Sequence, residues 1–501
     1  MRVINTIPAV SLMEPDSHFF EKTFLMSKKS WEVEQIYTGC LSQGSYYIRS
    51  GREAVVIDPL RETAPYLERA ERDGVEIKYI FETHFHADFV SGHLNLARKT
   101  GAPVIFGPKA NPSYKAYIAK DGEFFEFGKI KIKTLHSPGH TLESTCWLLL
   151  DENDRERAIF TGDTLFLGDV GRPDLAQADS DLTSEDLAGM LYDSLHEKIM
   201  PLPDDVIVYP GHGAGSACGK NMMKETVDTL GNQKKVNYAL KAKTKEDFIR
   251  AVTDGITAPP AYFPENVYLN KMGCPDLEAV MERSLNPLSP GKFVELASRH
   301  CAVILDTRSP DKFCKAFIPC SINIGLQGRF APWVGAVLEN IKKPILLVCD
   351  DECEKEAIMR LCRVGFDNII GYLDGGIESW KKSGRPLDRI ERVMPKDLEE
   401  SLKNGDELEL WDLRTPVEFG NLRIKGSKNR PLGSINDWSC RRTRGKILVL
   451  YCAAGYRSMI AASILKARGI HNFVEVDKGF NFLKQLDLEF ESDEKAGLQT
   501  V

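Results

Sequence analysis

The chain has 501 residues, enough for about three domains, and its 43% hydrophobic and 27% charged residues are ordinary for globular proteins. Its formal net charge of −7 excludes the strong positive field that binds nucleic-acid backbones. Because no apolar run approaches the roughly 18 residues that cross a bilayer, we expect neither a nucleic-acid partner nor a membrane span.

The start of the chain and its cysteines indicate a compartment. The first residues, MRVINTIPAV, lack the basic start and the small-residue cleavage site of a secretion signal. The twelve cysteines are scattered and include no CxxC pair, which is typical of reduced thiols rather than of a disulfide framework. We therefore expect a cytoplasmic protein.

Residues 1–250 predict one large α/β domain. Strand-like runs such as AVVID (54–58) and YIFET (79–83) alternate there with helix-like runs such as GHLNLARKTG (92–101). A linker follows over residues 251–285, where prolines and glycines are frequent. We expect no continuous helix or strand in this linker.

An internal repeat occupies the remaining residues. The segment LDTRSPDKFCKAFIPCSINI (305–324) shares D-x-R-[ST]-P and S-x-N with WDLRTPVEFGNLRIKGSKNR (411–430). After each segment come a buried-strand pattern, a short loop and a helix that ends at a glycine. The repeat predicts two smaller α/β domains, a first copy over residues 286–388 and a second copy over residues 389–501.

Four motifs place polar side chains after strand-like runs of the large domain. They are THFHADF (83–89), SPGHT (137–141), FTGDTLF (160–166) and YPGHG (209–213). Imidazoles two residues apart on an extended stretch point the same way and can converge on one ion. One HxH pair alone is a weak signal, but four such motifs in one α/β domain predict a metal site.

These motifs resemble those of the metallo-β-lactamase superfamily over roughly the first 245 residues. The resemblance implies an αββα sandwich with metal at one sheet edge, held in its first position by His84, His140 and Asp163. The binuclear pattern of the superfamily is H-x-H-x-D-H, and Phe89 replaces its last histidine. We therefore expect a mononuclear centre.

Two histidines and one carboxylate with open positions form the facial arrangement of non-haem Fe(II). The combination resembles the persulfide dioxygenase branch of the superfamily, in which iron oxidises a thiol persulfide to sulfite with O₂. This resemblance implies one Fe(II) per chain. His86, Asp88 and His212 would lie behind the ligands and orient them or bound waters, although His86 could also ligate directly.

Arg172 lies close after Asp163 in the stretch LGDVGRPDL (167–175), which also resembles that branch. Its guanidinium could bind the carboxylate of a glutathione-like persulfide. The alternative is an ordinary surface ion pair. Cys146 and Cys218 are interpreted as small buried residues.

The loop CAAGYRS (452–458) lies between a strand-like run and a helix in the second copy. The helix N-terminus and Arg457 both stabilise a negatively charged sulfur on Cys452. With D-x-R-[ST]-P upstream, the loop resembles the rhodanese family of sulfurtransferases, whose cysteine carries sulfane sulfur as Cys–S–SH. The resemblance implies that Cys452 and Arg457 are catalytic.

The first copy departs from this pattern, because its loop reads VCDDECEK (348–355). Aligning the helices that follow puts Val348 opposite Cys452 and leaves Cys349 one position off. Four nearby carboxylates disfavour a second anion there. We expect the first copy to transfer no sulfur and to serve as a spacer or interface, in a chain that forms a homo-oligomer. Cys349 and Cys353 could form a redox pair, or one could be a structural cysteine and the other an exposed one.

These sites together predict a persulfide dioxygenase fused to a sulfurtransferase, acting in sulfide detoxification. Its partners would be a small thiol persulfide, O₂ and sulfite or thiosulfate, with either direction of the thiosulfate reaction open. The carrier thiol is also open: glutathione, coenzyme A and cysteine all fit. Two alternatives are a glyoxalase-II-like zinc thioesterase, which attacks with metal-bound hydroxide, and a non-catalytic persulfide sensor.

Overall fold

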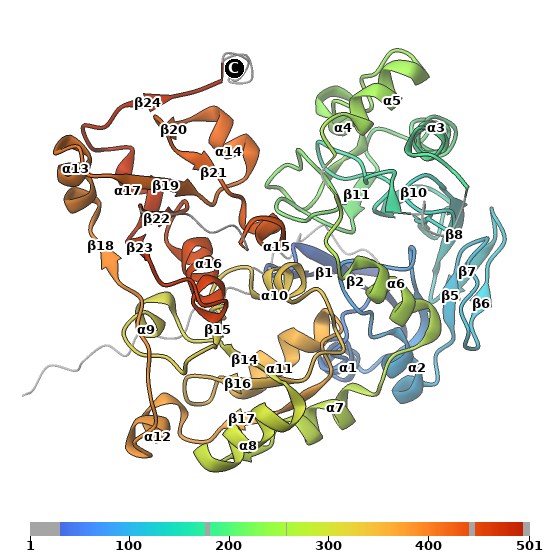
Figure 1. Ribbon diagram of the computed structural model, residues 1–501. Coiled ribbons are helices and arrows are strands. Elements are labelled where there is room, and N and C mark those ends of the chain that lie inside the picture. Colours follow the sequence, from blue (N-terminus) through green and yellow to red (C-terminus); the bar gives the residue numbers. More distant parts are fainter. Residues whose placement is uncertain (1–30, 176–180, 257, 440–445, 494–501) are drawn as a thin grey trace, which may run out of the picture.

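Two six-stranded sheets face each other in the large domain (Figure 1). The computed structural model describes residues 31–175, 181–256, 258–439 and 446–493 of the chain. The first sheet runs in the order β1 (Trp31–Thr38), β2 (Gln43–Ser50), β3 (Glu53–Ile57), β4 (Glu76–Phe81), β5 (Val104–Phe106) and β6 (Tyr117–Ile118). The second runs in the order β12 (Asp228–Thr229), β11 (Ile207–Pro210), β10 (Glu156–Gly162), β9 (Thr145–Leu150), β8 (Ile130–His136) and β7 (Phe124–Phe127).

Apolar side chains hold the two sheets together and bind helices to their outer faces. Phe81, Trp147 and Phe160 belong to the cluster between the sheets. Helices α1 (Ala64–Asp73) and α2 (His93–Thr100) cover the first sheet, and α3 (Ser184–Ser194), η2 (Leu195–Ile199), α4 (Leu230–Val236) and α5 (Lys245–Thr253) cover the second. The predicted αββα sandwich is confirmed.

The linker contains two helices, α6 (Phe263–Met272) and α7 (Leu277–Ser284), so our expectation of no continuous helix there was wrong. Its prolines do not break these helices because none lies in a helix interior: Pro264 is in the first turn of α6, and Pro275 precedes α7. In a first turn the missing N–H of proline has no intrahelical partner to lose. The prolines of the linker therefore lie at or before the starts of its helices, not within them.

The two copies have the same parallel five-stranded sheet, as predicted for the repeat. In the first copy the order is β13 (Pro287–Leu288), β17 (Ile369–Leu373), β16 (Ile345–Val348), β14 (Val303–Asp306) and β15 (Ile322–Asn323). In the second it is β18 (Arg392–Val393), β23 (Phe473–Val476), β22 (Ile447–Tyr451), β19 (Leu408–Asp412) and β21 (Lys428–Asn429).

Helices and one small extra sheet complete the copies. The first contains α8 (Pro290–His300), α9 (Pro310–Phe313), α10 (Phe330–Leu338), α11 (Glu354–Arg363) and α12 (Gly376–Lys382). The second contains α13 (Pro395–Lys403), α14 (Pro416–Asn421), η3 (Leu432–Ser434), α15 (Ile435–Trp438), α16 (Tyr456–Ala467) and α17 (Gly479–Leu483), with β20 (Arg423–Ile424) paired to β24 (Phe490–Glu491).

Strand register corrects our alignment of the two cysteine loops. Asp306 pairs with Val348 in the first copy, and the equivalent Asp412 pairs with Tyr451 in the second. Cys349, not Val348, therefore corresponds to Cys452. Aligning by helices misled because the loops differ in length: the helix begins at residue 354 after Cys349 but at residue 456 after Cys452, one residue sooner.

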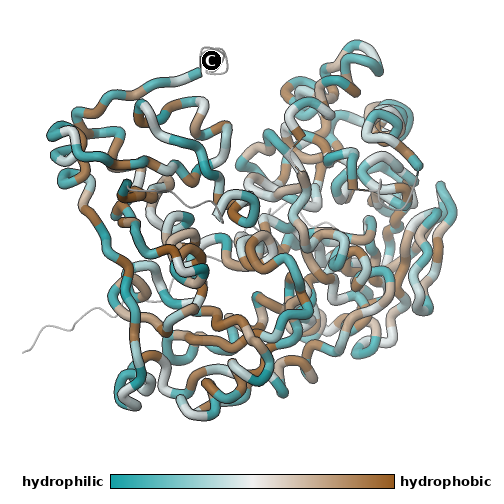
Figure 2. Tube along the Cα trace, viewed as in Figure 1, coloured by the Kyte–Doolittle hydropathy of each residue, from teal (hydrophilic) through white to brown (hydrophobic). Residues whose placement is uncertain are grey.

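The first copy contacts both other domains. Arg61 of the large domain, fully buried, pairs with Asp367 through two bonds of 2.5 and 2.7 Å, and Ser463 of α16 accepts the N–H of Asn323 at 2.9 Å. One apolar cluster runs from Phe89 through the first copy to Cys452. Figure 2 shows hydrophobic stretches in all three domains. Among the helices of the described residues, none combines the length and the apolar character of a bilayer span.

Candidate metal centre and cysteine loop

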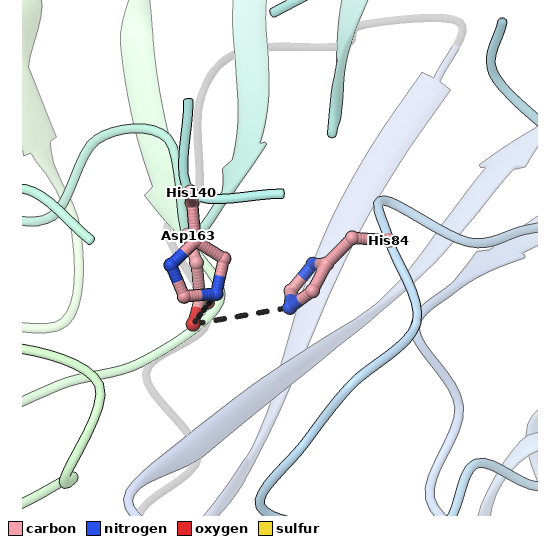
Figure 3. A group of neighbouring side chains, drawn as sticks. All are labelled: His84, His140 and Asp163. Carbon is pink, nitrogen blue, oxygen red and sulfur yellow. Dashed lines mark ion pairs between the residues drawn. The ribbon is translucent and has the colours of Figure 1, made fainter. Parts of the chain in front are cut away.

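The metal-type side chains of the large domain meet at one edge of the sandwich. His84 follows β4, while His140, Asp163 and His212 follow β8, β10 and β11. Asp163 Oδ2 lies 3.9 Å from His84 Nε2 and 3.4 Å from His140 Nε2, and both rings point toward this carboxylate (Figure 3). All three side chains are buried, and their donor atoms lie within 4.8 Å of one another. The structure thus brings together the three residues that we predicted as ligands.

Glycine allows this close approach. A Cβ atom on Gly211 would lie 2.6 Å from Asp163 Oδ1, and one on Gly162 would lie 2.5 Å from Thr83 Oγ1. Both distances are shorter than any real Cβ contact, so a side chain at either place would push the metal-side loops apart. The glycines of the FTGDT and YPGHG motifs are therefore part of the site geometry.

Hydrogen bonds fix which nitrogen of each histidine faces the centre. His140 Nδ1 donates to the carbonyl oxygen of Arg172 at 2.9 Å, and His212 Nδ1 donates to that of Ser42 at 3.3 Å. His84 Nδ1 lies 3.0 Å from Thr83 Oγ1, whose own proton goes to Asp58. Each Nε2 lone pair is therefore free to bind a cation.

The donor atoms are buried and unpaired, which is what a metal site requires. In the part of the chain that the structure describes, His140 Nε2, His212 Nε2 and both carboxylate oxygens of Asp163 are buried without a hydrogen-bond partner. Such groups are costly to bury alone. Burial and the neighbouring imidazoles hold the pKa of His84 well below its usual range, so its ring is in the neutral form that binds metal. The residues present therefore fit a metal ion.

A second donor group adjoins the first. His86, Asp88 and His212 offer donor atoms within 4.8 Å of one another, and His212 Nε2 lies 3.4 Å from Asp88 Oδ2 and 3.6 Å from Asp163 Oδ1. Burial opposes charge on His212, but Asp88 and Asp163 outweigh it and raise its pKa to about 10. The two carboxylates therefore favour positive charge at His212, either a proton on its ring or a metal ion bound to it.

Phe89 limits this second group. Its buried ring lies over His86, with centroids 4.3 Å apart, and contributes no donor. His86 Nε2 also lies 3.1 Å from Asp58 Oδ1. The orienting role of His86, Asp88 and His212, and the count of one metal per chain, stay predictions.

Cys218 is a site residue that the motifs did not reveal. It is buried, and its sulfur lies within 4.8 Å of donor atoms of Asp163 and His212. Burial, with Asp88 and Asp163 adding to it, raises its pKa well above the usual value, so the thiol keeps its proton. The sequence carried one signal, namely that Cys218 follows His212 closely in the chain.

Arg172 is buried rather than on the surface. Its Nε and Nη2 both bond Asp174 at 2.7 Å, and its Nη1 donates to the carbonyl of Ala217 at 3.3 Å. Arg172 thus forms an ion pair, which was our alternative prediction, but the pair is buried. It holds Arg172 in place, and the backbone carbonyl of Arg172 accepts the hydrogen bond that orients His140. A role of Arg172 toward substrate stays a prediction.

Asn270 of the linker helix α6 holds the metal-side loop. Its Nδ2 donates to the carbonyls of His86 and Phe89 at 2.7 and 2.8 Å, and its Oδ1 accepts the N–H of Ser91 at 2.8 Å. The loop is thus fixed from outside the large domain. The sequence missed this residue because we expected no helix here.

An Asn270→Leu variant should therefore bind metal more weakly, by roughly 10- to 100-fold, because three backbone groups of the loop lose their partner. Metal content after dialysis against a chelator measures this effect. Tyr268→Ala, on an exposed position of the same helix, is the control and should retain metal. Wild-type retention by Asn270→Leu would show that the loop does not need Asn270.

The cysteine loop of the second copy encloses Cys452. The sulfur is buried, accepts the N–H of Gly455 at 3.2 Å and lies 3.5 Å from Ser458 Oγ. Arg457 pairs with Glu418 of α14 through two bonds of 2.7 and 2.8 Å. Burial opposes charge on Glu418, but Arg457 outweighs it and lowers the pKa of Glu418 to about 2. Catalytic roles for Cys452 and Arg457 stay predictions.

Cys349 occupies the corresponding place in the first copy but in different surroundings. Burial raises its pKa far above the usual range, and the carboxylates of Glu354 and Asp306 add to this effect. Cys349 and Cys353 are both free thiols. Because Cys349 has the register of Cys452, position no longer argues against sulfur transfer by the first copy. Our prediction that the first copy transfers no sulfur now rests on the charges around the Cys349 thiol.

Comparison with known families agrees with this organisation. The metallo-β-lactamase superfamily matches residues 38–212, and the rhodanese-like domain matches residues 289–383 and 394–485. A crystal structure titled as a metallo-β-lactamase from Staphylococcus aureus subsp. aureus COL is 31% identical, with a TM-score of 0.63, and covers 69% of this chain and 99% of its own.

Relatives that are named for different activities have about the same sequence identity to this chain. The human persulfide dioxygenase ETHE1 is 36% identical over 33% of this chain and 60% of its own length, and the bovine protein is 32% identical over 42% and 75%. A probable hydroxyacylglutathione hydrolase (glo2) of Schizosaccharomyces pombe is 33% identical over 29% and 52%. The chain therefore spans between about half and three quarters of these relatives.

Proposed function

Because the chain belongs to the metallo-β-lactamase superfamily and carries two rhodanese-like domains, we propose that it is a persulfide dioxygenase fused to a sulfurtransferase. It would oxidise a small thiol persulfide with O₂ to sulfite and form or use thiosulfate at Cys452. Sulfide detoxification is the process that such a pair of reactions serves.

The observation that carries the proposal is the buried trio of His84, His140 and Asp163. Two imidazoles and one carboxylate leave coordination positions open, which is the arrangement of non-haem Fe(II) enzymes that use O₂. When bound, Fe(II) would supply the redox chemistry that adds oxygen to the persulfide sulfur. The 36% identity to human persulfide dioxygenase supports the same assignment.

The residues of this chain contribute the orientation. The Arg172 carbonyl and the Thr83 hydroxyl hold the rings of His140 and His84, and Asn270 holds the loop between β4 and α2. The protonated thiol of Cys218 lies beside Asp163 and avoids adding a third negative charge to the site. Apolar surroundings that include Phe89 and Phe166 limit water access.

Cys452 would carry sulfur in the second half of the reaction. Its thiolate attacks the outer sulfur of R–S–SH and the S–S bond breaks. R–S⁻ leaves and takes up a proton from the solvent as R–SH, while Cys452 becomes the persulfide Cys–S–SH. Sulfite then attacks the outer sulfur of the cysteine persulfide and leaves as thiosulfate. The N–H of Gly455 stabilises negative charge on the Cys452 sulfur throughout.

Metal content and oxygen uptake test this function together. We expect about one iron per chain and uptake of O₂ on adding glutathione persulfide to the anaerobically purified protein. Coenzyme A persulfide and cysteine persulfide in parallel identify the thiol. Zinc in the protein, without uptake after iron reconstitution, would contradict the dioxygenase.

A zinc thioesterase is the second candidate, supported by the donor group of His86, Asp88 and His212 beside the first one. A second metal there would favour hydrolysis by metal-bound hydroxide, as the similarity to a probable hydroxyacylglutathione hydrolase also suggests. Two zinc ions per chain with hydrolysis of a glutathione thioester would establish this candidate instead.

Location and assembly belong to the same proposal. All eleven cysteines within the described residues are free thiols, which supports a reducing compartment, and we propose the cytoplasm. A homo-oligomer is also proposed, and light scattering of the purified protein measures it.

A further inference from the structure

A buried carboxylate lies behind the sulfur-carrying cysteine. Glu475 is in β23 of the second copy and its side chain is fully buried. Charged side chains are almost never fully buried unless they are paired or have a chemical role. The rhodanese resemblance and the mechanism above give Glu475 no task.

A chain of contacts joins Glu475 to the Cys452 sulfur. Ser458 Oγ donates to Glu475 Oε1 at 2.5 Å and lies 3.5 Å from Cys452 Sγ. The carbonyl of Gly455, at 3.1 Å, is a second acceptor within reach of the Ser458 hydroxyl, but Glu475 Oε1 is nearer and carries charge. With the Ser458 proton on the Glu475 side, the Ser458 oxygen faces Cys452 as an acceptor for the S–H proton. All three side chains are buried, so water does not compete for these positions.

The other carboxylate oxygen of Glu475 faces a guanidinium. Arg392 Nε donates to Glu475 Oε2 at 2.8 Å, and Arg392 Nη1 pairs with Asp311 of the first copy and lies 3.4 Å from Asp477. The thiol of Cys314 is also close enough for its charge to interact with that of Glu475. The charged groups around Glu475 are thus the guanidinium of Arg392 and the carboxylates of Asp311 and Asp477.

These surroundings set the protonation of Glu475. Burial raises its pKa to about 7, with Arg392 and Ser458 opposing this effect and Asp477 adding to it. A carboxyl group with a pKa near neutral both accepts and returns a proton at physiological pH. At pH 8 it is mostly ionised and can accept one.

The first copy lacks this arrangement. Register pairs Val393 with Val476 in the second copy and Leu288 with Leu373 in the first, so Tyr372 stands where the second copy has Glu475. A tyrosine cannot act as the same proton acceptor, and the carboxylates near Cys349 raise the pKa of that thiol. The buried carboxylate therefore occurs in the copy with the rhodanese-type loop.

We propose that Glu475 is a positioning residue that accepts, through Ser458, the proton that Cys452 loses when it becomes a nucleophile. The S–H bond of Cys452 breaks and its proton goes to the Ser458 oxygen, while the Ser458 proton passes to Glu475 Oε1. The thiolate attacks the outer sulfur of R–S–SH, the S–S bond breaks, and the leaving R–S⁻ takes up one proton from the solvent to become R–SH. Glu475 then releases the proton of Cys452 to the solvent, so that the protons balance. No outside oxidant or reductant is needed.

The sulfur step rests on the proposed function, but deprotonation of Cys452 does not. The test therefore measures alkylation of Cys452 by iodoacetamide in the full-length protein, followed on the Cys452 peptide by mass spectrometry between pH 5.5 and 9. In the wild type the rate should rise with pH through a midpoint near 7, because Glu475 accepts a proton only when ionised.

Glu475→Gln should slow alkylation at pH 7.5 by roughly 100-fold and abolish the midpoint near pH 7. Ser458→Ala should have the same effect with Glu475 intact, so the test survives if one variant fails to fold. The control is Asp477→Asn, which removes a carboxylate near Arg392 that does not contact Ser458. It should keep the wild-type alkylation rate at pH 7.5, and its midpoint should lie slightly below that of the wild type because Asp477 no longer helps to raise the pKa of Glu475.

A purely electrostatic role of Glu475 predicts the opposite change in the alkylation rate. If Glu475 acts only as a nearby negative charge, its removal favours the thiolate and Glu475→Gln speeds alkylation. Faster or unchanged alkylation in Glu475→Gln would overturn the proposal. A wild-type protein with the expected alkylation profile but no thiosulfate turnover would contradict the proposed function and leave the proton path standing.

Discussion

An Asp163→Asn variant is expected to lose its bound metal and, with it, persulfide-dependent oxygen uptake. Asp163 is the only carboxylate of the first donor trio, and its two oxygens face His84 and His140 on one side and His212 on the other. Asparagine keeps the size of the side chain but removes the charge that balances a divalent cation. Metal affinity should fall by more than about 100-fold, beyond the usual effect of residues behind the ligands.

Metal analysis and an oxygen electrode measure the two losses separately. Asp205→Asn, an exposed carboxylate of the same domain, is the control and should keep both properties. If Asp163→Asn retained a full equivalent of metal, the ion would be held by His86, Asp88 and His212, and the first donor trio would not be the centre.

A Cys452→Ser variant is expected to keep oxygen uptake with added persulfide and to lose thiosulfate turnover. The serine oxygen cannot hold sulfane sulfur, while the metal-side loops belong to another domain. Removal of a covalent nucleophile should lower this turnover by more than about 10³-fold. Sulfite and thiosulfate measured by chromatography during oxygen uptake check both halves of the expectation.

The matched control is Cys349→Ser, at the same strand register in the first copy. It should leave both reactions unchanged because the Cys349 thiol stays protonated. Thiosulfate turnover that persisted in Cys452→Ser would show that Cys452 is not the carrier. Loss of turnover in Cys349→Ser would give the first copy a part in sulfur transfer.

The sequence patterns predicted an α/β domain, the two copies and a metal site, and the family resemblance of the motifs implied the αββα sandwich. These features follow from local pattern, because a ligand placed directly after a strand emerges at the carboxyl edge of its sheet. His84, His140 and Asp163 meet for this reason. The metal-ligand and sulfur-carrier roles remain to be tested by the variants above.

Tertiary structure decided the features that depend on contacts between distant segments. Asn270 bonds the loop at His86 from 184 residues away, Cys218 joins the metal-side cluster, and Glu475 reaches Cys452 through Ser458. The register of Cys349 likewise required the paired strand, because the loop that follows changes length between copies. Such contacts leave no periodic signal in the chain, since a buried polar group is satisfied by whichever partner the fold brings near it.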